Sequence, residues 1–96
     1  MSLQTPIINN KNLSRFETEI NGEFAYVNYS FFKDGIALLY VFVPVSARGQ
    51  GISSSLTKFA LEYVKEEKLK LKVYCSVIAR YIKNHPEYEA LLADRS

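Results

Sequence analysis

A glycine turn in the middle of the chain has the residue types that bind anions. Residues 48–53 read Arg-Gly-Gln-Gly-Ile-Ser, between an apolar run at 36–43 and an amphipathic segment that we expect to be a helix over 52–67. The first N–H groups of a helix lack partners within the helix, and the helix dipole adds about half a positive charge there. The turn therefore indicates an anion site, although a plain tight connection between strand and helix fits the same spacing.

Two common phosphate-binding motifs do not fit this turn. A P-loop requires Gly-Lys-Ser/Thr, but Ile52 follows the second glycine. The dinucleotide fingerprint requires a third glycine within a mostly parallel sheet, whereas this turn has two glycines and follows segments that read as hairpins. Hydrolysis of nucleoside triphosphates and dinucleotide binding are therefore both disfavoured.

Three residues beyond the turn can do chemistry: Cys75, Tyr81 and His85. Cys75 is the only cysteine and His85 the only histidine, so an internal disulfide and a four-ligand zinc site are excluded and we expect no metal. A cysteine on an alternating strand is most often a small core residue, but Cys75 directly precedes a predicted helix, whose N-terminus stabilises a thiolate nucleophile. Tyr81 fits a buried core position equally well, and His85 can cap the last helix.

The elements before the turn read as antiparallel hairpins. Residues 13–20 alternate polar and apolar side chains, Asn21-Gly22 predicts a type I′ turn, and residues 23–32 form the return strand. The apolar run at 36–43 predicts a central strand covered on both faces. Pro44 cannot donate to a ladder, so we expect pairing to end there and to leave the backbone of Phe42 and Val43 open to an extended ligand.

The elements after the turn read as one β-α-β unit with two further helices. We expect a short strand over 71–75 parallel to 36–43, a helix over 76–83 with Ser76 as its N-cap, and a last helix over 87–93 after the break at Pro86. The predicted class is α+β (mixed α/β), an antiparallel β-meander joined to a βαβ unit with helices packed on the sheet. Residues 1–12 read as a flexible arm that Ile7 and Ile8 can pin to a sheet edge, and residues 13–96 as a single domain.

Composition and net charge limit the compartment and the partners that we expect. With a net charge of +2 over 96 residues, the chain lacks the strong basic excess of a dedicated duplex binder, and a nucleic-acid-associated domain is the weakest interpretation. No apolar run approaches the roughly 18 residues that cross a membrane, so we expect no membrane partner. A single thiol fits a reducing compartment, and we expect a soluble, cytoplasmic protein.

The sequence around the turn matches a known family pattern. Arg48-x-x-Gly51-x-Ser53, after Val43-Pro44, resembles motif A of the GCN5-related N-acetyltransferases, Gln/Arg-x-x-Gly-x-Gly/Ala, which follows a strand that splays at a bulge. Ser53 departs from the pattern, but serine is small and its hydroxyl can donate to phosphate. Residues 43–88 also resemble a very small subfamily of this group, which carries a cysteine after the strand that follows motif A and a Tyr-Ile-Lys-x-His-Pro-Glu-Tyr tail, here residues 81–88.

The resemblance implies a minimal acyl-CoA N-acyltransferase-like fold and acetyl-coenzyme A as acyl donor. The pyrophosphate of the coenzyme would bind the backbone of the turn, and its pantetheine arm would lie along the preceding strand. The coenzyme-binding residues implied are Phe42, Val43, Arg48, Gly49, Gln50, Gly51, Ser53 and Ser54.

Two chemical routes and two functions remain open. Cys75 would accept the acetyl group and pass it to an amine, or the amine would attack directly while Tyr81 protonates the leaving thiolate, with His85 as a base or a coenzyme contact. The chain is too short for the family's acceptor-covering helices, so the acceptor side should be open to a protein or polyamine amine, or completed by a partner chain. The alternative function is a coenzyme-binding sensor or adaptor with little or no turnover.

Overall fold

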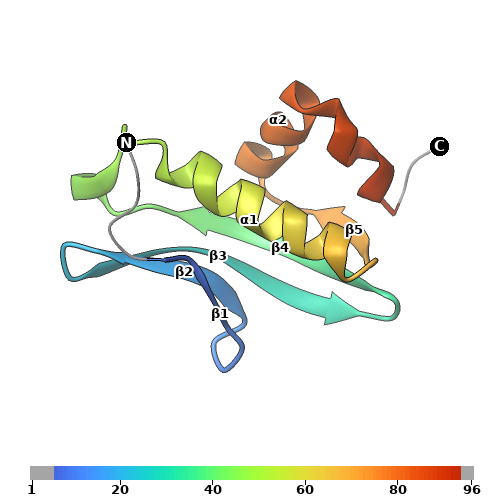
Figure 1. The fold of residues 1–96 in the computed structure, drawn as a ribbon, viewed down its shortest axis with the longest axis horizontal. Helices are drawn as coiled ribbons and strands as arrows, with labels where there is room; N and C mark the ends of the chain where they lie inside the picture. Colours follow the sequence, from blue (N-terminus) through green and yellow to red (C-terminus); the bar gives the residue numbers. More distant parts are fainter. Residues whose placement is uncertain (1–5, 94–96) are drawn as a thin grey trace.

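The computed structural model describes residues 6–93, in which a helix lies across one face of a five-stranded sheet (Figure 1). The strands and helices follow the predicted order, preceded by one further strand. Their bounds are β1 Ile8–Asn10, β2 Arg15–Ile20, β3 Glu23–Phe32, β4 Gly35–Phe42, η1 Val45–Ala47, α1 Ile52–Glu66, β5 Lys70–Val73, α2 Ser76–Asn84 and η2 Pro86–Leu91, where η denotes a 3₁₀ helix.

The sheet confirms the predicted mixed α+β class. Its strand order is β1-β2-β3-β4-β5, antiparallel throughout except for the parallel pair of β4 with β5 across α1. Asn21 and Gly22 both have positive φ, 53° and 80°, as the predicted type I′ turn requires. Part of the expected arm is ordered: residues 8–10 pair with β2 as an edge strand, while residues 1–5 lie outside the described range.

The strand β4 is interior rather than central, because β3 occupies the middle of the sheet. Only its first half, Gly35 to Leu38, is buried, whereas Tyr40 is 53% exposed. The expectation of cover on both faces is therefore wrong for the second half. The second half also lacks the β5 neighbour, because β5 has four residues and pairs with the first half alone.

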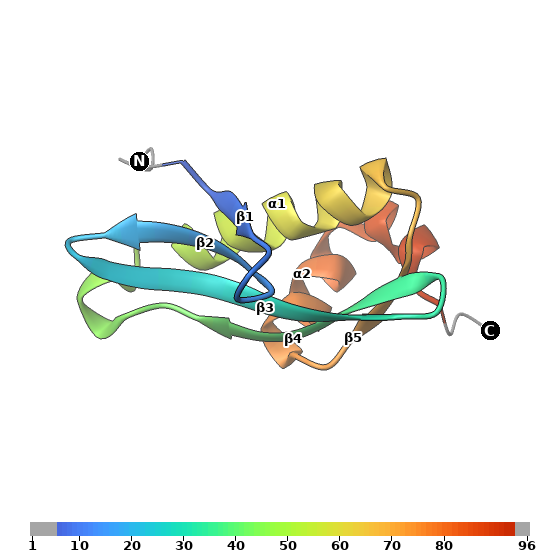
Figure 2. The same ribbon diagram turned by 90° about the horizontal axis from the view of Figure 1, so that it is seen from below.

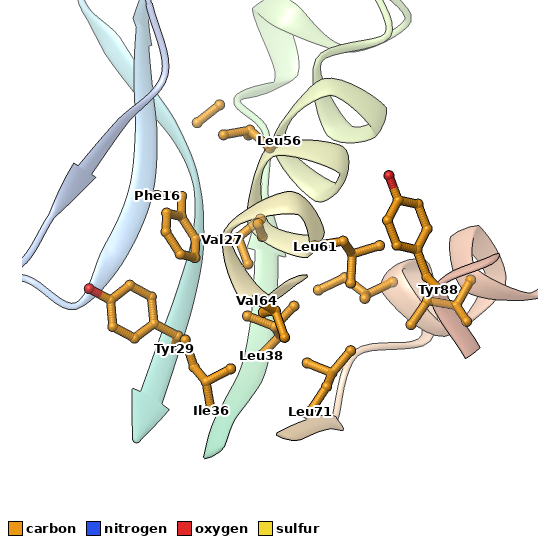
Figure 3. Close-up of a cluster of buried hydrophobic side chains, with 14 of the residues drawn as sticks. Phe16, Val27, Tyr29, Ile36, Leu38, Leu56, Leu61, Val64, Leu71 and Tyr88 are labelled. Atoms are coloured by element: carbon orange, nitrogen blue, oxygen red, sulfur yellow. The ribbon is translucent and has the colours of Figure 1, made fainter. Parts of the chain in front are cut away.

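The core lies between the sheet and α1 (Figure 3). Phe16, Val27 and Leu38 project from the strands toward Leu56 and Val64 of the helix, and all five side chains are fully buried. The buried stripe of α1 includes Leu61, whereas Phe59 is 36% exposed. Leu61 is buried because α1 also packs against α2 and η2, on the side where Tyr88 lies.

The C-terminal corner departs from the prediction in three places. Cys75, not Ser76, is the N-cap of α2, and it makes no side-chain capping bond. The last helix is the 3₁₀ segment η2, which begins at Pro86 because proline suits the first helical position. Residues 92 and 93 lie along β5 instead of continuing the helix: Leu92 bridges Leu71, and the Ala93 N–H donates to the Leu71 carbonyl at 2.8 Å.

Candidate functional site

The strands β4 and β5 separate midway along β4. Their pairing ends at Leu38 and Val73, and the last bond runs from the Tyr74 N–H to the Leu38 carbonyl at 3.0 Å. At the same level Leu39 is an extra residue against β3, since Asn28 pairs with Tyr40 and Tyr29 pairs with Leu38. A bulge of this kind bends and twists a strand, so β4 continues beyond β5 along β3 alone (Figure 1).

This splay lies earlier in the chain than predicted. Pairing toward β5 ends at Leu38, and pairing toward β3 continues to Phe42. Pro44 therefore does not set the opening; the bulge at Leu39 does, together with the short β5. The stretch of β4 backbone without a strand partner on its β5 side thus covers residues 39–42 and is longer than expected.

The glycine turn follows η1 and forms the N-terminus of α1. Gly51 is the N-cap in a left-handed conformation, with φ of 76° and no side-chain cap hydrogen bond. Gly49 also has positive φ, 81°, and neither glycine has a heavy atom within 4 Å of where a Cβ would stand. Both positions need glycine for the backbone conformation, and the space around them is open to a ligand.

A hollow of about 120 Å³ lies at this turn. It brings together six of the predicted coenzyme-binding residues, while Phe42 and Gln50 lie outside its lining. The Phe42 ring instead packs on Tyr26, with 5.5 Å between centroids. The lining is Val43, Ala47, Arg48, Gly49, Gly51, Ile52, Ser53 and Ser54.

Arg48, the first residue of the glycine turn, bonds back to the end of β4. Its Nε donates to the Val43 carbonyl at 3.0 Å, across the segment that contains η1. The Val43 carbonyl is therefore already hydrogen-bonded and is not open in the way the sequence predicted. This bond ties the start of the glycine turn to the residue that follows β4.

A second hollow, of about 210 Å³, adjoins the first and shares Ser53 and Ser54 with it. It lies between α1 and α2, and it contains Tyr81 and His85. The sequence prediction missed Thr57, Arg80 and Asn84, although the spacing of 77, 80, 81 and 84 on one helix face was a usable signal. The lining is Ser53, Ser54, Thr57, Val77, Arg80, Tyr81, Asn84 and His85.

Thr57 carries an orphaned hydroxyl in this hollow. The residue is fully buried, and its Oγ1 has no hydrogen-bond partner in the described part of the chain. Leaving a buried hydroxyl unpaired costs about 1–3 kcal/mol. A polar group of a ligand would satisfy it.

Tyr81 and His85 are held as a stacked pair. Their ring centroids lie 4.0 Å apart at 15°, and His85 Nδ1 is 2.8 Å from the Tyr81 carbonyl. Because a carbonyl only accepts, Nδ1 donates here, and Nε2 of the neutral ring is left with its lone pair. Burial raises the pKa of Tyr81, and the Glu87 and Glu62 carboxylates raise it further, so its hydroxyl keeps its proton.

Tyr88 connects the last helical segment to α1. Its hydroxyl donates to Glu62 Oε2 at 2.5 Å, and this bond, followed by burial, raises the pKa of Tyr88 strongly. The residue is 4% exposed and belongs to the core cluster. Tyr74, in contrast, is 68% exposed.

Cys75 stands apart from the stacked pair. It is half-buried at the N-cap of α2 and packs against the core. It lines neither of the two hollows. The structure therefore brings Tyr81 and His85 together with Ser53 and Ser54 of the turn, and leaves the thiol outside that group.

Residues 6–93 contain neither a metal-binding cluster nor a helix that could span a membrane. In that range no group of three or more His, Cys, Asp or Glu side chains is placed to hold a metal ion. No helix in the same range is long and apolar enough to span a bilayer.

Comparison with known proteins gives a consistent result. The family model for GCN5-related N-acetyl-transferase matches residues 15–91. Protein NATD1 of Xenopus tropicalis is 35% identical over 75 residues, which cover 75% of this chain and 69% of that protein. Protein NATD1 of Danio rerio is 30% identical over 93 residues, 92% of this chain and 84% of that protein.

A solved structure shares the fold. The NMR solution structure of a GCN5-like protein from Staphylococcus aureus superposes with a TM-score of 0.71 at 21% identity, and the match covers 96% of this chain and 91% of that chain. The family match spans most of the described residues, and the predicted family is thereby confirmed. The chain belongs to the GCN5-related N-acetyltransferase family.

Proposed function

We propose that this protein is an acetyl-coenzyme A-dependent N-acetyltransferase. The observation that carries the proposal is the continuity of the site: an uncapped helix N-terminus at the glycine turn, a hollow shared with Tyr81 and His85, and an open strand edge beside them. Family membership adds the coenzyme as the expected acyl donor.

The residues present fit this coenzyme. The uncapped N–H groups of α1 and the open space at Gly49 and Gly51 suit a pyrophosphate. The unpaired edge of β4 over 39–42 suits an extended amide-bearing arm, and the orphaned hydroxyl of Thr57 suits a polar group of the same ligand. When bound, acetyl-coenzyme A supplies an activated acetyl thioester.

Tyr81 and His85 are the proposed proton carriers. His85 Nε2 has a free lone pair, so it takes the proton that the acceptor amine loses as the new C–N bond forms. Tyr81 keeps its hydroxyl proton because its pKa is raised by burial and by Glu87 and Glu62, so it gives that proton to sulfur as the C–S bond breaks. His85 gains one proton and Tyr81 loses one, so the net charge of the two side chains together is unchanged.

This direct route is preferred to transfer through Cys75, because the thiol lines neither hollow. The acceptor is an amine, of a protein or a polyamine. In the part of the chain that the structure describes, α1 lies on one side of β2 and β3, and no helix lies on the other side of these two strands (Figure 2). This supports an acceptor side that is open or completed by a partner chain.

The test is calorimetric titration with acetyl-coenzyme A, followed by intact mass of the same sample. We expect binding, and about 100-fold weaker binding in Gly51→Glu, where a carboxylate stands at the pyrophosphate position. Gly22→Glu is the matched control, because Gly22 also has positive φ and open space but lies in a distant hairpin. Equal affinity of the two variants would show that the turn is not the coenzyme site.

The intact mass and the acetylation rate then distinguish transfer through Cys75 from direct transfer. A stable adduct of about 42 Da that Cys75→Ala abolishes would support the thiol route over direct transfer. With direct transfer we expect no adduct, and a rate with polyamine or lysine-peptide acceptors that Tyr81→Phe lowers.

The second candidate is a coenzyme-binding module without turnover. It is favoured by one observation, that none of the described residues lining either hollow has an acidic side chain to attract an amine. It shares the binding result with the first candidate, but no acceptor would be acetylated above background, and Tyr81→Phe would change no rate.

A further inference from the structure

The second hollow of the candidate site has walls that suit an anion. Its polar side chains, besides the Tyr81–His85 pair, are three hydroxyls, one amide and one guanidinium, and none of the described residues that line it is acidic. One of the hydroxyls, that of Thr57, is fully buried and has no partner in the described part of the chain. A buried hydroxyl of this kind can donate to an anion. The walls therefore favour a negatively charged group as ligand.

The guanidinium in this hollow belongs to Arg80, and it has no partner. Arg80 is exposed on α2 and makes no side-chain hydrogen bond or ion pair with any of residues 6–93. The two other arginines in that range are both engaged: Arg15 pairs with Glu17, and Arg48 donates to the Val43 carbonyl. The donors of Arg80 are therefore available to a ligand.

Two carboxylates lie near the hollow without lining it. Glu62 and Glu87 both raise the pKa of Tyr81, but neither is part of the walls. Glu62 accepts the hydrogen bond of Tyr88, and no ion pair joins either carboxylate to Arg80 within residues 6–93. The charge of Arg80 is therefore not neutralised by the described part of the chain.

Arg80 and the N-terminus of α1 contribute to the same hollow from two different helices. Ser53 and Ser54 belong to the first turn of α1, where backbone N–H groups lack partners within the helix and the helix dipole is positive. Arg80 comes from α2. An anion in the hollow is therefore attracted both by the start of α1 and by the side chain of α2.

We propose that Arg80 binds a phosphate group of the acyl donor, so that the protein selects donors that carry phosphate. This inference rests on the proposed function, because it concerns the same site and the same donor. Acetyl-coenzyme A has two kinds of phosphate, the pyrophosphate and the 3′-phosphate of its ribose, and phosphate oxygens match the planar fork of a guanidinium. Arg80 and Tyr81 are successive residues, about 100° apart around the helix axis, so a phosphate at Arg80 leaves Tyr81 free to act at the thioester.

The test compares three donors that differ in phosphate content: acetyl-coenzyme A, its 3′-dephospho form, and S-acetyl-pantetheine, which has no phosphate. Calorimetry measures the first two with the full chain, and NMR titration, which reaches millimolar affinities, measures the third. Arg80→Gln should bind acetyl-coenzyme A about tenfold more weakly than the parent chain, because it loses a charged hydrogen bond. The parent chain and this variant should respond alike to S-acetyl-pantetheine.

The matched control is Lys83→Gln. It removes the same charge from an exposed position of the same helix that lines neither hollow of the candidate site, and it should bind acetyl-coenzyme A within about twofold of the parent chain. Glutamine has nearly the helix propensity of arginine and lysine, so both variants should retain α2, and far-ultraviolet circular dichroism checks this.

The dephospho donor identifies the phosphate that Arg80 contacts. A loss in Arg80→Gln that persists with this donor assigns Arg80 to the pyrophosphate, and a loss that disappears assigns it to the 3′-phosphate. The inference is overturned if Arg80→Gln binds acetyl-coenzyme A like the control, or if it weakens S-acetyl-pantetheine equally, as a structural role would. A parent chain that binds none of the three donors would contradict the proposed function as well, whereas donor binding that does not depend on Arg80 contradicts this inference alone.

Discussion

The two halves of β4 belong to one continuous strand but have opposite roles. The first half, Gly35 to Leu38, is buried and paired on both sides, by β3 and by β5. The second half, residues 39–42, is paired on one side and partly exposed, and it leads into the glycine turn. One extra residue, Leu39, separates them. The first half of the strand therefore belongs to the packed sheet, whereas the second half has a strand partner among residues 6–93 only on its β3 side.

The largest expected effect on stability tests the difference in packing between the two halves of β4. Leu38→Ala removes a fully buried side chain and should lower the free energy of unfolding by about 3 kcal/mol. Leu39→Ala, at the half-buried bulge position, should cost about 1 kcal/mol. Urea denaturation of both variants measures this. Equal losses would mean that the bulge does not divide the strand energetically.

A smaller loss is expected from Gly35, at the start of the packed half. A Cβ there would stand 2.5 Å from the Lys70 carbonyl oxygen and would overlap the Phe32 ring. Gly35→Ala should therefore cost about 2 kcal/mol, because the parallel contact of β4 with β5 must widen. Urea denaturation gives the loss, and coenzyme affinity measured on the folded protein should stay unchanged. A weakened affinity would show that the packed half also shapes the site.

Substitutions of Thr57 should separate the effect of its hydroxyl on stability from its effect on ligand binding. Thr57→Val keeps the shape and removes the orphaned hydroxyl, so the free chain should gain about 1 kcal/mol in thermal or urea unfolding. Acetyl-coenzyme A should then bind about fivefold more weakly, since the ligand loses one hydrogen bond. Thr57→Ser retains the hydroxyl and should retain the affinity. Tighter or unchanged binding by the valine variant would argue that the hydroxyl serves no ligand.

The smallest effect concerns Tyr88 and depends on pH. The hydrogen bond to Glu62 raises the pKa of Tyr88 above its ordinary value of 10.0, so the folded state holds this proton more tightly than the unfolded state. The stabilisation, about 1 kcal/mol, is complete below pH 10 and declines as the pH rises above it. Unfolding of the parent chain and Tyr88→Phe, compared from neutral pH to above pH 10, should show a difference that shrinks at the alkaline end. A difference that stays constant with pH would contradict this.

Local patterns predicted the elements well because their signals are short-range. Asn21-Gly22 specifies its own turn through the φ values that it permits, and Gly49 and Gly51 do the same at the start of α1. The periodicity of residues 52–66 identified a helix correctly. It did not decide that Leu61 would be buried and Phe59 partly exposed, because the position of η2 against α1 selects the buried side.

The candidate site was predicted only in part, because the sequence signals are short-range. The turn residues share one hollow because they are neighbours in sequence. Thr57 and Arg80 line the second hollow, which forms only where α1 packs on α2, and a sequence pattern does not predict that contact. Cys75 was predicted as a site residue because it precedes a helix. The sequence did not predict which residues of that helix would face the glycine turn.

The sequence by itself determined the β-meander, the glycine turn, the crossover helix and the family. These follow from backbone preferences and from hydrophobic periodicity, which act over a few residues. Only the tertiary structure decided where β4 and β5 part, which α2 residues face α1, and that residues 92 and 93 lie along β5 at Leu71. Those features depend on a one-residue register shift at Leu39 and on the docking of η2 and residues 92–93, contacts between segments far apart in the chain.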